Sequence, residues 1–150
     1  MTKAIRRLGR DEGFTLIELM VVVMIIAVLI AIAIPSFLGF RRSAQDRSAQ
    51  SEIRSVLLAE KAFWLENGGY TAAAADINAF EPNAQINADS TLGVTLTINA
   101  DTDYVCLTRT SESGTVFSVW ESASDGTYYG EGALAACPAV APGTHAQGGW

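Results

Sequence analysis

The chain has 150 residues, of which 49% are hydrophobic, and a formal net charge of −6 at pH 7. This length suits one domain, and the hydrophobic fraction is high for a soluble protein. Between residues 67 and 150, nine acidic residues stand against a single base, Arg109. Because nucleic-acid binding depends on Lys and Arg at the phosphates, this acidic part is not expected to bind DNA or RNA.

A short basic leader precedes a long apolar run. Residues 1–13 contain four bases and two acids, whereas the stretch 14–34 contains only two polar side chains, Thr15 and Glu18. In a helix, about 20 residues span the roughly 30 Å hydrocarbon core of a bilayer, so residues 14–35 are predicted to form a transmembrane helix. The run has no polar face that could meet water, which argues against a helix in a soluble core.

A secretory signal peptide is the competing interpretation of this apolar run, because Ala31-Ile32-Ala33 offers a small-x-small cleavage triplet. Signal peptides, however, usually have apolar regions of only about 7–15 residues.

Glu18 is unexpected in a plain anchor, since an acid at the centre of a membrane helix costs about 2.5–3.5 kcal/mol. Either its side chain reaches back to the lipid headgroups, or it meets a cation at the same depth.

These residues together form a motif that resembles the N-terminus of type IV prepilins and of the related pseudopilins of type II secretion. The resemblance rests on a charged leader, an uninterrupted apolar helix and five residues at fixed places: Gly13, Phe14, Thr15, Glu18 and Pro35. It implies that prepilin peptidase removes the leader by cutting between Gly13 and Phe14, and that it methylates the new amine of Phe14. Because the cut precedes the apolar run, the membrane helix is kept.

The resemblance also implies a role for Glu18. In a filament, Glu18 of one subunit would meet the N-terminal amine of Phe14 of a neighbour. Such a buried pair is a weak source of stability but sets the register, because every other alignment leaves a buried charge unpaired. Thr15 is expected to act beside Glu18 in assembly; the alternative is that its hydroxyl bonds back to its own helix or lies at the rim of the membrane.

The sequence stays helical in character after the membrane segment, over residues 36–66. Pro35 removes a backbone donor and Gly39 loosens the same turns, so a kink or a locally unwound segment is expected there. Two apolar stripes follow at helical spacing. The first contains Ile53, Val56, Leu57, Phe63 and Trp64, and the second contains Leu58, Ala62 and Leu65. Two faces need two partners: the helix's own domain and a neighbouring subunit, or a domain that wraps the helix more fully. Glu60 falls within the first stripe, where only pairing with a basic neighbour would account for it.

The pattern changes after residues 67–69, Asn-Gly-Gly, which end the helix because glycine accepts the left-handed backbone after a last turn. Residues 71–91 lack a steady period and predict an irregular loop with at most one short helical turn. From residue 92 the period is two, and turn residues separate strands expected near 94–98, 104–110, 115–121 and 127–130. The predicted fold is therefore α+β and pilin-like: a long N-terminal helix packed on a C-terminal antiparallel sheet of about four strands.

Both cysteines lie in the expected β-domain, residues 67–140. A disulfide between Cys106 and Cys137 would close a loop of about thirty residues and contribute roughly 3–4 kcal/mol, but only in an oxidising compartment. Two buried free thiols are the alternative. With the disulfide outside the cytoplasm, the basic leader lies inside. Residues 141–150, which include His145, are expected to be a flexible tail.

No combination of residues predicts catalysis. The GxSxG, P-loop and HExxH motifs are absent, and the cysteines lack CxxC spacing. Asp101, Asp103 and Asp125 are candidates to bind calcium, as acidic loops do in major pseudopilins, but the full EF-hand pattern is missing and solvated turn acids are the simpler interpretation. No enzymatic activity, cofactor or metal is expected.

The sequence and the resemblance together predict a structural subunit of an extracellular type IV pilus-like filament. Such a subunit begins as a single-pass precursor in the inner membrane with its N-terminus inside. After cleavage it polymerises, with the help of a membrane assembly platform, into a helical homo-oligomer. One alternative is a pseudopilin of a type II secretion system, for which the resemblance implies a calcium loop rather than a C-terminal disulfide. Another is a single-pass anchored binding domain that never polymerises, and a tethered enzyme is the least expected.

Overall fold

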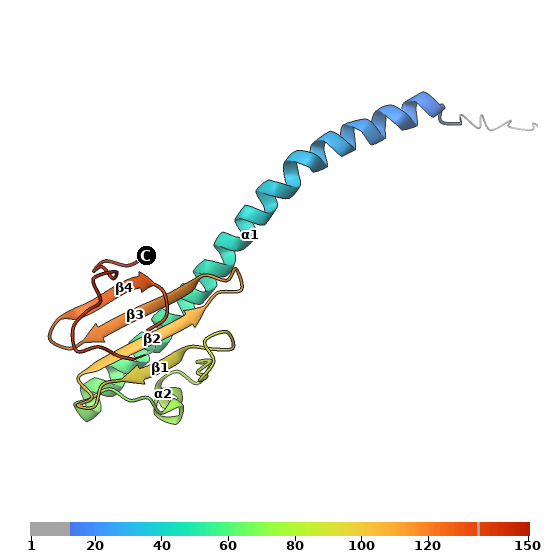
Figure 1. Cartoon of the computed structure of the whole chain (residues 1–150). Coiled ribbons are helices and arrows are strands. Elements are labelled where there is room, and N and C mark those ends of the chain that lie inside the picture. The colour runs from blue at the N-terminus through green and yellow to red at the C-terminus, as the bar shows by residue number, and fades with distance from the viewer. Residues whose placement is uncertain (1–12, 135) are drawn as a thin grey trace, which may run out of the picture. The chain divides into compact units, whose positions relative to one another are not determined.

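A computed structural model describes residues 13–134 and 136–150. The predicted leader therefore lies outside the described residues, apart from Gly13. The elements appear in the order α1 (Leu16–Asn67), α2 (Ala74–Phe80), β1 (Thr95–Ile98), β2 (Tyr104–Thr110), β3 (Val116–Ser122) and β4 (Gly126–Glu131) (Figure 1). The chain divides into two compact units, and the boundary in the sequence lies between Gly39 and Phe40.

Helix α1 is 52 residues long and belongs to both units. It stays helical through Pro35 and Gly39, so the local unwinding expected there is not observed, while the kink stays a prediction. The helix ends at Asn67, and Gly68 follows with φ 77°, a left-handed conformation that glycine adopts without strain. The N–H of Gly68 donates to the carbonyl of Trp64 at 2.8 Å, which closes the last turn at the predicted place.

The four strands form one antiparallel sheet in the order β1-β2-β3-β4, so each strand pairs with its neighbour in sequence. Leu107 on β2 lies opposite Val119 on β3, and Val119 lies opposite Tyr129 on β4. Successive side chains of a strand point to opposite faces, so these residues share the inner face of the sheet. The predicted α+β fold with four strands is confirmed.

The second half of α1 covers this inner face, as the first apolar stripe predicted (Figure 1). On the helix, Ile53, Val56 and Leu57 are at most 4% exposed. On the sheet, Val105, Leu107, Phe117 and Val119 complete the same cluster. Phe63 and Trp64 pack against its edge and stay half-buried. The core is therefore a single layer of side chains between one helix and one sheet.

The connection between α1 and β1 is irregular, as expected, and contains one short helix. Helix α2 has seven residues and buries only Ile77, which joins the core. Its Phe80 meets Phe63 of α1 edge to face, with ring centroids 6.3 Å apart. Farther along, Ile86 forms a parallel bridge with Val94, immediately before β1.

Residues 141–150 pack against the sheet, so the expectation of a flexible tail is wrong. Ala146 exchanges two backbone hydrogen bonds of 2.9 Å with Tyr129 of β4, which covers the free edge of that strand. The indole N–H of Trp150 donates to the carbonyl of Gly130 at 3.0 Å. The small residues of this segment suggested a loose chain, but its terminal tryptophan supplies enough apolar surface to hold it in place.

Candidate functional site

Gly13 and Phe14, the two residues of the predicted cleavage site, precede α1 and belong to no helix or strand. Phe14 is 86% exposed, and a Cβ placed on Gly13 would meet no atom of the described residues within 4 Å. Within the described part of the chain, nothing therefore covers either residue of the predicted scissile bond.

Thr15 and Glu18 form a capping box at the start of α1. The backbone N–H of Thr15 donates to Glu18 Oε2 at 2.9 Å, and the N–H of Glu18 donates back to Thr15 Oγ1 at 3.2 Å. The hydroxyl of Thr15 also donates to Glu18 Oε2 at 2.7 Å. Because α1 begins at Leu16, Thr15 is the N-cap and Glu18 is the third helical residue, which is the spacing that a capping box requires.

The capping box gives Glu18 a partner within its own chain, which the sequence analysis did not foresee for the acid. Among the described residues, all hydrogen bonds of this carboxylate use Oε2, so Oε1 is open to a further donor. The alternative raised for Thr15, a hydroxyl bonded to its own helix, is the arrangement in the structure. The four-residue pattern Thr-Leu-Ile-Glu before an apolar run was the signal for it.

In the first unit, α1 exposes all of its apolar side chains. The large ones between Leu16 and Leu38 are 47–76% exposed. Within the part of the chain that the structure describes, α1 is the only helix that is long and apolar enough to cross a membrane, and none of its most apolar 18-residue window is buried. These side chains therefore need apolar surroundings that this chain does not supply.

The second half of α1 also keeps one apolar face uncovered. Leu58 is 68% exposed and Leu65 is 77% exposed, and Ala62 lies between them at helical spacing. These residues are the second stripe predicted from the sequence. The domain does not wrap the helix more fully, so this stripe is free to meet another molecule.

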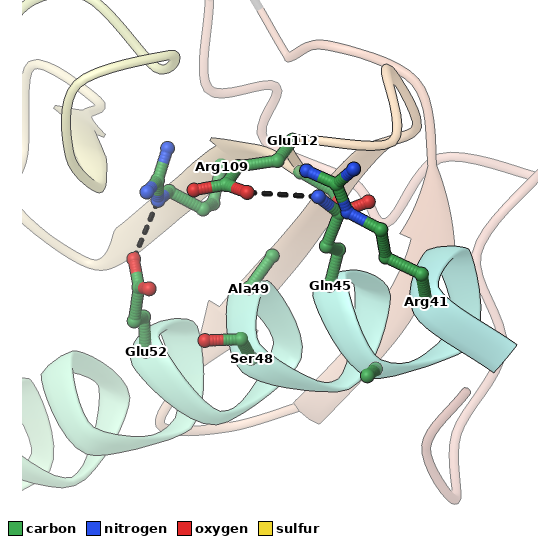
Figure 2. A pocket seen from close by; sticks show the side chains of 9 residues that line it. Arg41, Gln45, Ser48, Ala49, Glu52, Arg109 and Glu112 are labelled. Carbon is green, nitrogen blue, oxygen red and sulfur yellow. Dashed lines mark hydrogen bonds and ion pairs between the residues drawn. The ribbon is translucent and has the colours of Figure 1, made fainter. Parts of the chain in front are cut away.

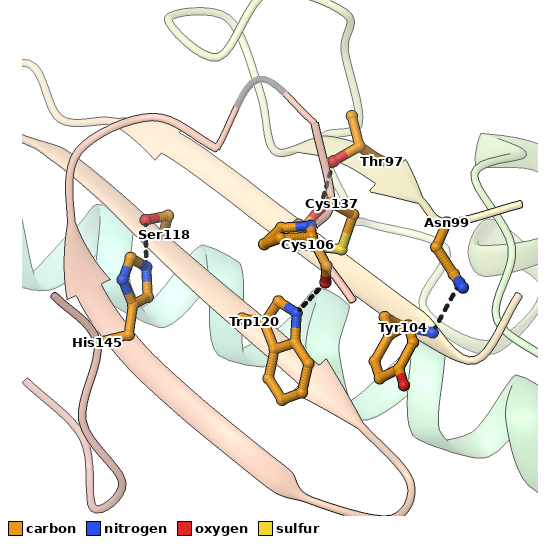
Figure 3. The surroundings of a disulfide bond; sticks show 9 residues. Thr97, Asn99, Tyr104, Cys106, Ser118, Trp120, Cys137 and His145 are labelled. Atoms are coloured by element: carbon orange, nitrogen blue, oxygen red, sulfur yellow. Dashed lines mark hydrogen bonds between the residues drawn. A yellow bond between two sulfur atoms is a disulfide. The ribbon is translucent and has the colours of Figure 1, made fainter. Parts of the chain in front are cut away.

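Cys106 and Cys137 form a disulfide, as the sequence predicted, with Cα atoms 5.4 Å apart (Figure 3). Cys106 lies opposite Trp120, on the face of the sheet that points away from α1. The indole N–H of Trp120 donates to the carbonyl of Pro138 at 2.7 Å, and its ring stacks on Tyr104 at 5.3 Å. The disulfide therefore fastens the segment after β4 across the outer face.

His145 helps to hold the C-terminal segment against the sheet. It is 8% exposed, and its Nε2 lies 2.8 Å from Ser118 Oγ, which donates to the carbonyl of Gly132 (Figure 3). Nε2 therefore carries the proton and donates to Ser118. A Cβ on Gly130 would lie 2.6 Å from the imidazole ring, so only glycine leaves room for it. Burial lowers the pKa of His145 from its ordinary value.

A polar groove of about 360 Å³ lies between α1 and β2 (Figure 2). Arg109 forms an ion pair with Glu52 of α1 and donates to the carbonyls of Ser90 and Thr91 at 2.9 Å. At the other end, the side-chain amide of Gln45 donates to Glu112 at 2.8 Å. The contacts of Arg109 and Gln45 therefore brace the helix against the sheet and the preceding loop.

Glu60 is a buried acid whose surroundings differ from those expected from the sequence. It is 0% exposed, yet it accepts a hydrogen bond only from the backbone N–H of Thr71. The expected basic partner is not found among the described residues, because the adjacent Lys61 pairs with Glu121 instead.

No group of three or more His, Cys, Asp or Glu residues able to hold a metal occurs in residues 13–134 and 136–150.

The N-terminal motif and the helix that follows it have matches among known proteins. The family model for the prokaryotic N-terminal methylation motif matches residues 8–34. The chain is 43% identical over 68 residues to the type IV major pilin protein PilA of Myxococcus xanthus, covering 45% of this chain and 31% of that protein. It is 36% identical over 61 residues to the type IV wide pilus major component PilA4 of Thermus thermophilus, covering 41% of this chain and 47% of that one.

A similar match is found with a secretion protein. The type II secretion system core protein G of Pectobacterium carotovorum is 34% identical over 70 residues, which is 47% of this chain and 45% of that protein. The chain therefore carries the N-terminal methylation motif and is similar over its N-terminal part to type IV pilins and to a type II secretion core protein, as the motif suggested. It spans about a third to a half of the length of these curated relatives.

Proposed function

We propose that the chain is the precursor of a structural subunit of a type IV pilus-like filament. The observation that carries this proposal is the contrast within α1, whose first half buries no side chain while its second half packs on a sheet. Together with the methylation motif, this contrast suits a subunit whose apolar half-helix contacts lipid before assembly and the helices of neighbouring subunits in the filament.

Processing by prepilin peptidase is the first step of the proposed function. The enzyme cuts between Gly13 and Phe14 and methylates the new amine of Phe14. The exposure of Phe14 and the open space beside Gly13 are compatible with that cut. The precursor lies in the inner membrane with its leader inside, and residues 14–35 remain as the membrane helix until assembly.

Glu18 sets the register of assembly in this proposal. Its Oε2 is held by the capping box of its own helix, and its Oε1 remains open. The amine of Phe14 from a neighbour can therefore bind the carboxylate without breaking the cap. Because an unpaired charge in an apolar core is costly, alignments that separate the two groups are disfavoured.

The stripe of Leu58, Ala62 and Leu65 is proposed as a second contact between subunits. It lies on the opposite side of α1 from the buried stripe that packs on the sheet. Burying a fully exposed leucine is favourable by about 1.5–3 kcal/mol, so even two leucines would add useful stability to each subunit contact. The result would be a helical homo-oligomer, built from the membrane with the help of an assembly platform.

Two observations on purified material test the proposal directly. N-terminal sequencing of the mature protein should start at Phe14, and sheared cell surfaces should yield filaments made of the mature chain. A mature N-terminus at Met1 or Thr2, or one after Ala33, would refute processing at Gly13. Correct processing with a chain that stays monomeric in the membrane would favour the anchored binding domain.

Substitutions at Glu18 separate the cap from the proposed contact between subunits. Glu18→Gln keeps a side chain that can accept from the N–H of Thr15 but removes the charge, whereas Glu18→Val removes both. We expect both variants to insert into the membrane and to lower the yield of filaments at least about tenfold, because the neighbour's amine loses its partner in each case. Normal filaments from Glu18→Gln would show that capping, and not charge pairing, is what assembly needs.

A pseudopilin of a type II secretion system is the second candidate function, because core protein G is among the relatives. The disulfide of Cys106 and Cys137 favours a pilus subunit, since the family resemblance implies a calcium loop at that end of major pseudopilins. Deleting the gene distinguishes the two: loss of surface filaments with normal export of proteins supports the pilus, and the reverse supports the secretion system.

A further inference from the structure

Glu60 is a buried acid held by a single hydrogen bond. Its side chain lies on the face of α1 that packs on the core, with none of its surface exposed. Oε2 accepts from the backbone N–H of Thr71 at 3.3 Å, while Oε1 has no hydrogen-bond partner among the described residues. A buried carboxylate without a cation or several donors is costly in its ionised form.

A second buried acid, Glu121 on β3, differs from Glu60 because its charge is stabilised by a cation and by hydroxyl donors. Glu121 is 3% exposed, and its Oε1 lies 3.1 Å from the ammonium group of Lys61. The hydroxyls of Tyr70 and Thr127 also donate to it. The cation nearest to Glu60 in sequence, Lys61, is therefore already committed to Glu121.

The other charged group that faces Glu60 is also acidic. Asp76 of α2 repels a charge on Glu60, and the phenol of Tyr70 stays neutral because burial and the charges of Glu121 and Glu60 raise its pKa well above its usual range. Burial, with a smaller contribution from Asp76, raises the pKa of Glu60 to about 7, against the opposing effect of the Thr71 hydrogen bond. Glu60 therefore changes charge near neutral pH.

Thr71 connects Glu60 to helix α2. Its backbone N–H is the one donor to Glu60, and its hydroxyl donates to Asp76 at 3.0 Å while accepting from the N–H of Ala73, also at 3.0 Å. A change at Glu60 is therefore passed through one residue to the first turn of α2. Apart from this link, α2 is held by Ile77, its only buried residue, and by Phe80, whose ring packs on Phe63 of α1.

We propose that Glu60 is a pH-sensitive latch between α1 and residues 70–80. In the neutral acid form, Glu60 lies in the core without needing a cation, and the segment that contains α2 stays docked. In the ionised form, the carboxylate is stabilised by reaching water, and it does so when residues 70–80 detach from the helix. The latch lies wholly within the second unit, and it does not depend on whether the chain forms filaments.

Hydrogen exchange measured by mass spectrometry on the full-length chain in detergent micelles tests the latch. The measured quantity is the protection of peptides covering residues 68–82, corrected for intrinsic exchange rates, between about pH 5.5 and about pH 8.5. With a pKa of about 7 in the docked state and 4.5 in the open state, the opening equilibrium should increase roughly thirtyfold over this range. Peptides from β2 and β3 should not change.

Two variants make the test specific. Glu60→Gln keeps an acceptor for the N–H of Thr71 but cannot ionise, so its protection at 68–82 should no longer depend on pH. The matched control is Glu66→Gln, an exposed acid on the same helix, which should keep the wild-type profile. If Glu60→Gln does not fold, Asp76→Asn serves instead, because removing the repelling charge should reduce the size of the pH effect. A flat wild-type profile, or an unchanged profile in either variant, would overturn the proposal.

Discussion

The two halves of helix α1 share one backbone conformation and differ in what their side chains contact. No described residue before Gly39 is buried, whereas six residues between Phe40 and Asn67 are. Leaving one large apolar side chain in water costs about 1.5–3 kcal/mol of free energy. Exposing the whole first half of α1 to water would therefore cost roughly tens of kcal/mol. The second half pairs its apolar stripe with a sheet from the same chain. Stability is therefore supplied from outside in one unit and from inside in the other.

Removing the first unit should have the largest effect on the behaviour of the chain in solution. A chain that begins at Arg41 keeps the core residues, the sheet and the disulfide, because all of them belong to the second unit. We expect it to be soluble without detergent and to unfold in one cooperative transition, whereas the full-length chain should need detergent. Solubility, circular dichroism and denaturant unfolding of the two chains measure this. An unfolded or aggregated truncated chain would show that the second unit depends on the first.

Two neighbouring leucines lie on different faces of α1 within the second unit. Leu57 is 4% exposed and Leu58 is 68% exposed. Leu57→Ala should lower the free energy of unfolding by about 2–5 kcal/mol, because it leaves a cavity in the core. Leu58→Ala should change it by less than about 0.5 kcal/mol. Urea unfolding followed by tryptophan fluorescence measures both variants.

The same pair of variants also tests the assembly surface. If the stripe containing Leu58 and Leu65 contacts a neighbouring subunit, Leu58→Ala should lower the yield of filaments while leaving the isolated subunit stable. Equal losses of stability in Leu57→Ala and Leu58→Ala would mean that the two faces of α1 are not distinct. Filament yields that follow only monomer stability would remove the stripe from the proposed interface.

The helix and the sheet could be predicted because their signals are local and repeated. The residues of β1 alternate in polarity, and glycine-containing turns separate β2, β3 and β4, so the last three strands lie within a residue or two of their expected positions. The end of α1 followed from Asn67 and two glycines. The capping box could also have been found, because Thr15 and Glu18 have the required spacing before an apolar run.

The C-terminal segment and the surroundings of Glu60 could not be predicted in this way, because both depend on contacts between residues distant in sequence. Trp150 packs edge to face on Phe117, 33 positions earlier in the printed sequence, with ring centroids 5.5 Å apart. Glu60 lost its expected partner because Lys61 reaches Glu121 on β3. The small residues of the C-terminal segment favour an unpacked chain, but the contacts of one aromatic ring are enough to hold the segment on the sheet.

Acidification gives the smallest expected effect, and it should act on the second unit alone. Between Gly13 and Gly39, Glu18 is the only Asp, Glu or His. Burial lowers the pKa of His145 below its ordinary value of 6.5, so the unfolded segment binds a proton more readily than the packed one. Stability from a neutral His145 is therefore complete above about pH 6.5 and is lost as the pH falls through the lowered pKa. Hydrogen exchange of residues 144–150 should become faster in acid, while peptides from 19–39 should not respond.

His145→Gln is the variant that tests this last effect, since an amide can still donate to Ser118 but does not titrate. Its C-terminal peptides should exchange at a rate that no longer depends on pH, once intrinsic rates are corrected. The direction is opposite to that at Glu60, where raising the pH loosens residues 70–80. A full pH series on one sample should therefore show the C-terminal segment opening in acid and the α2 segment opening in base. Parallel responses of the two segments would instead indicate global unfolding of the second unit.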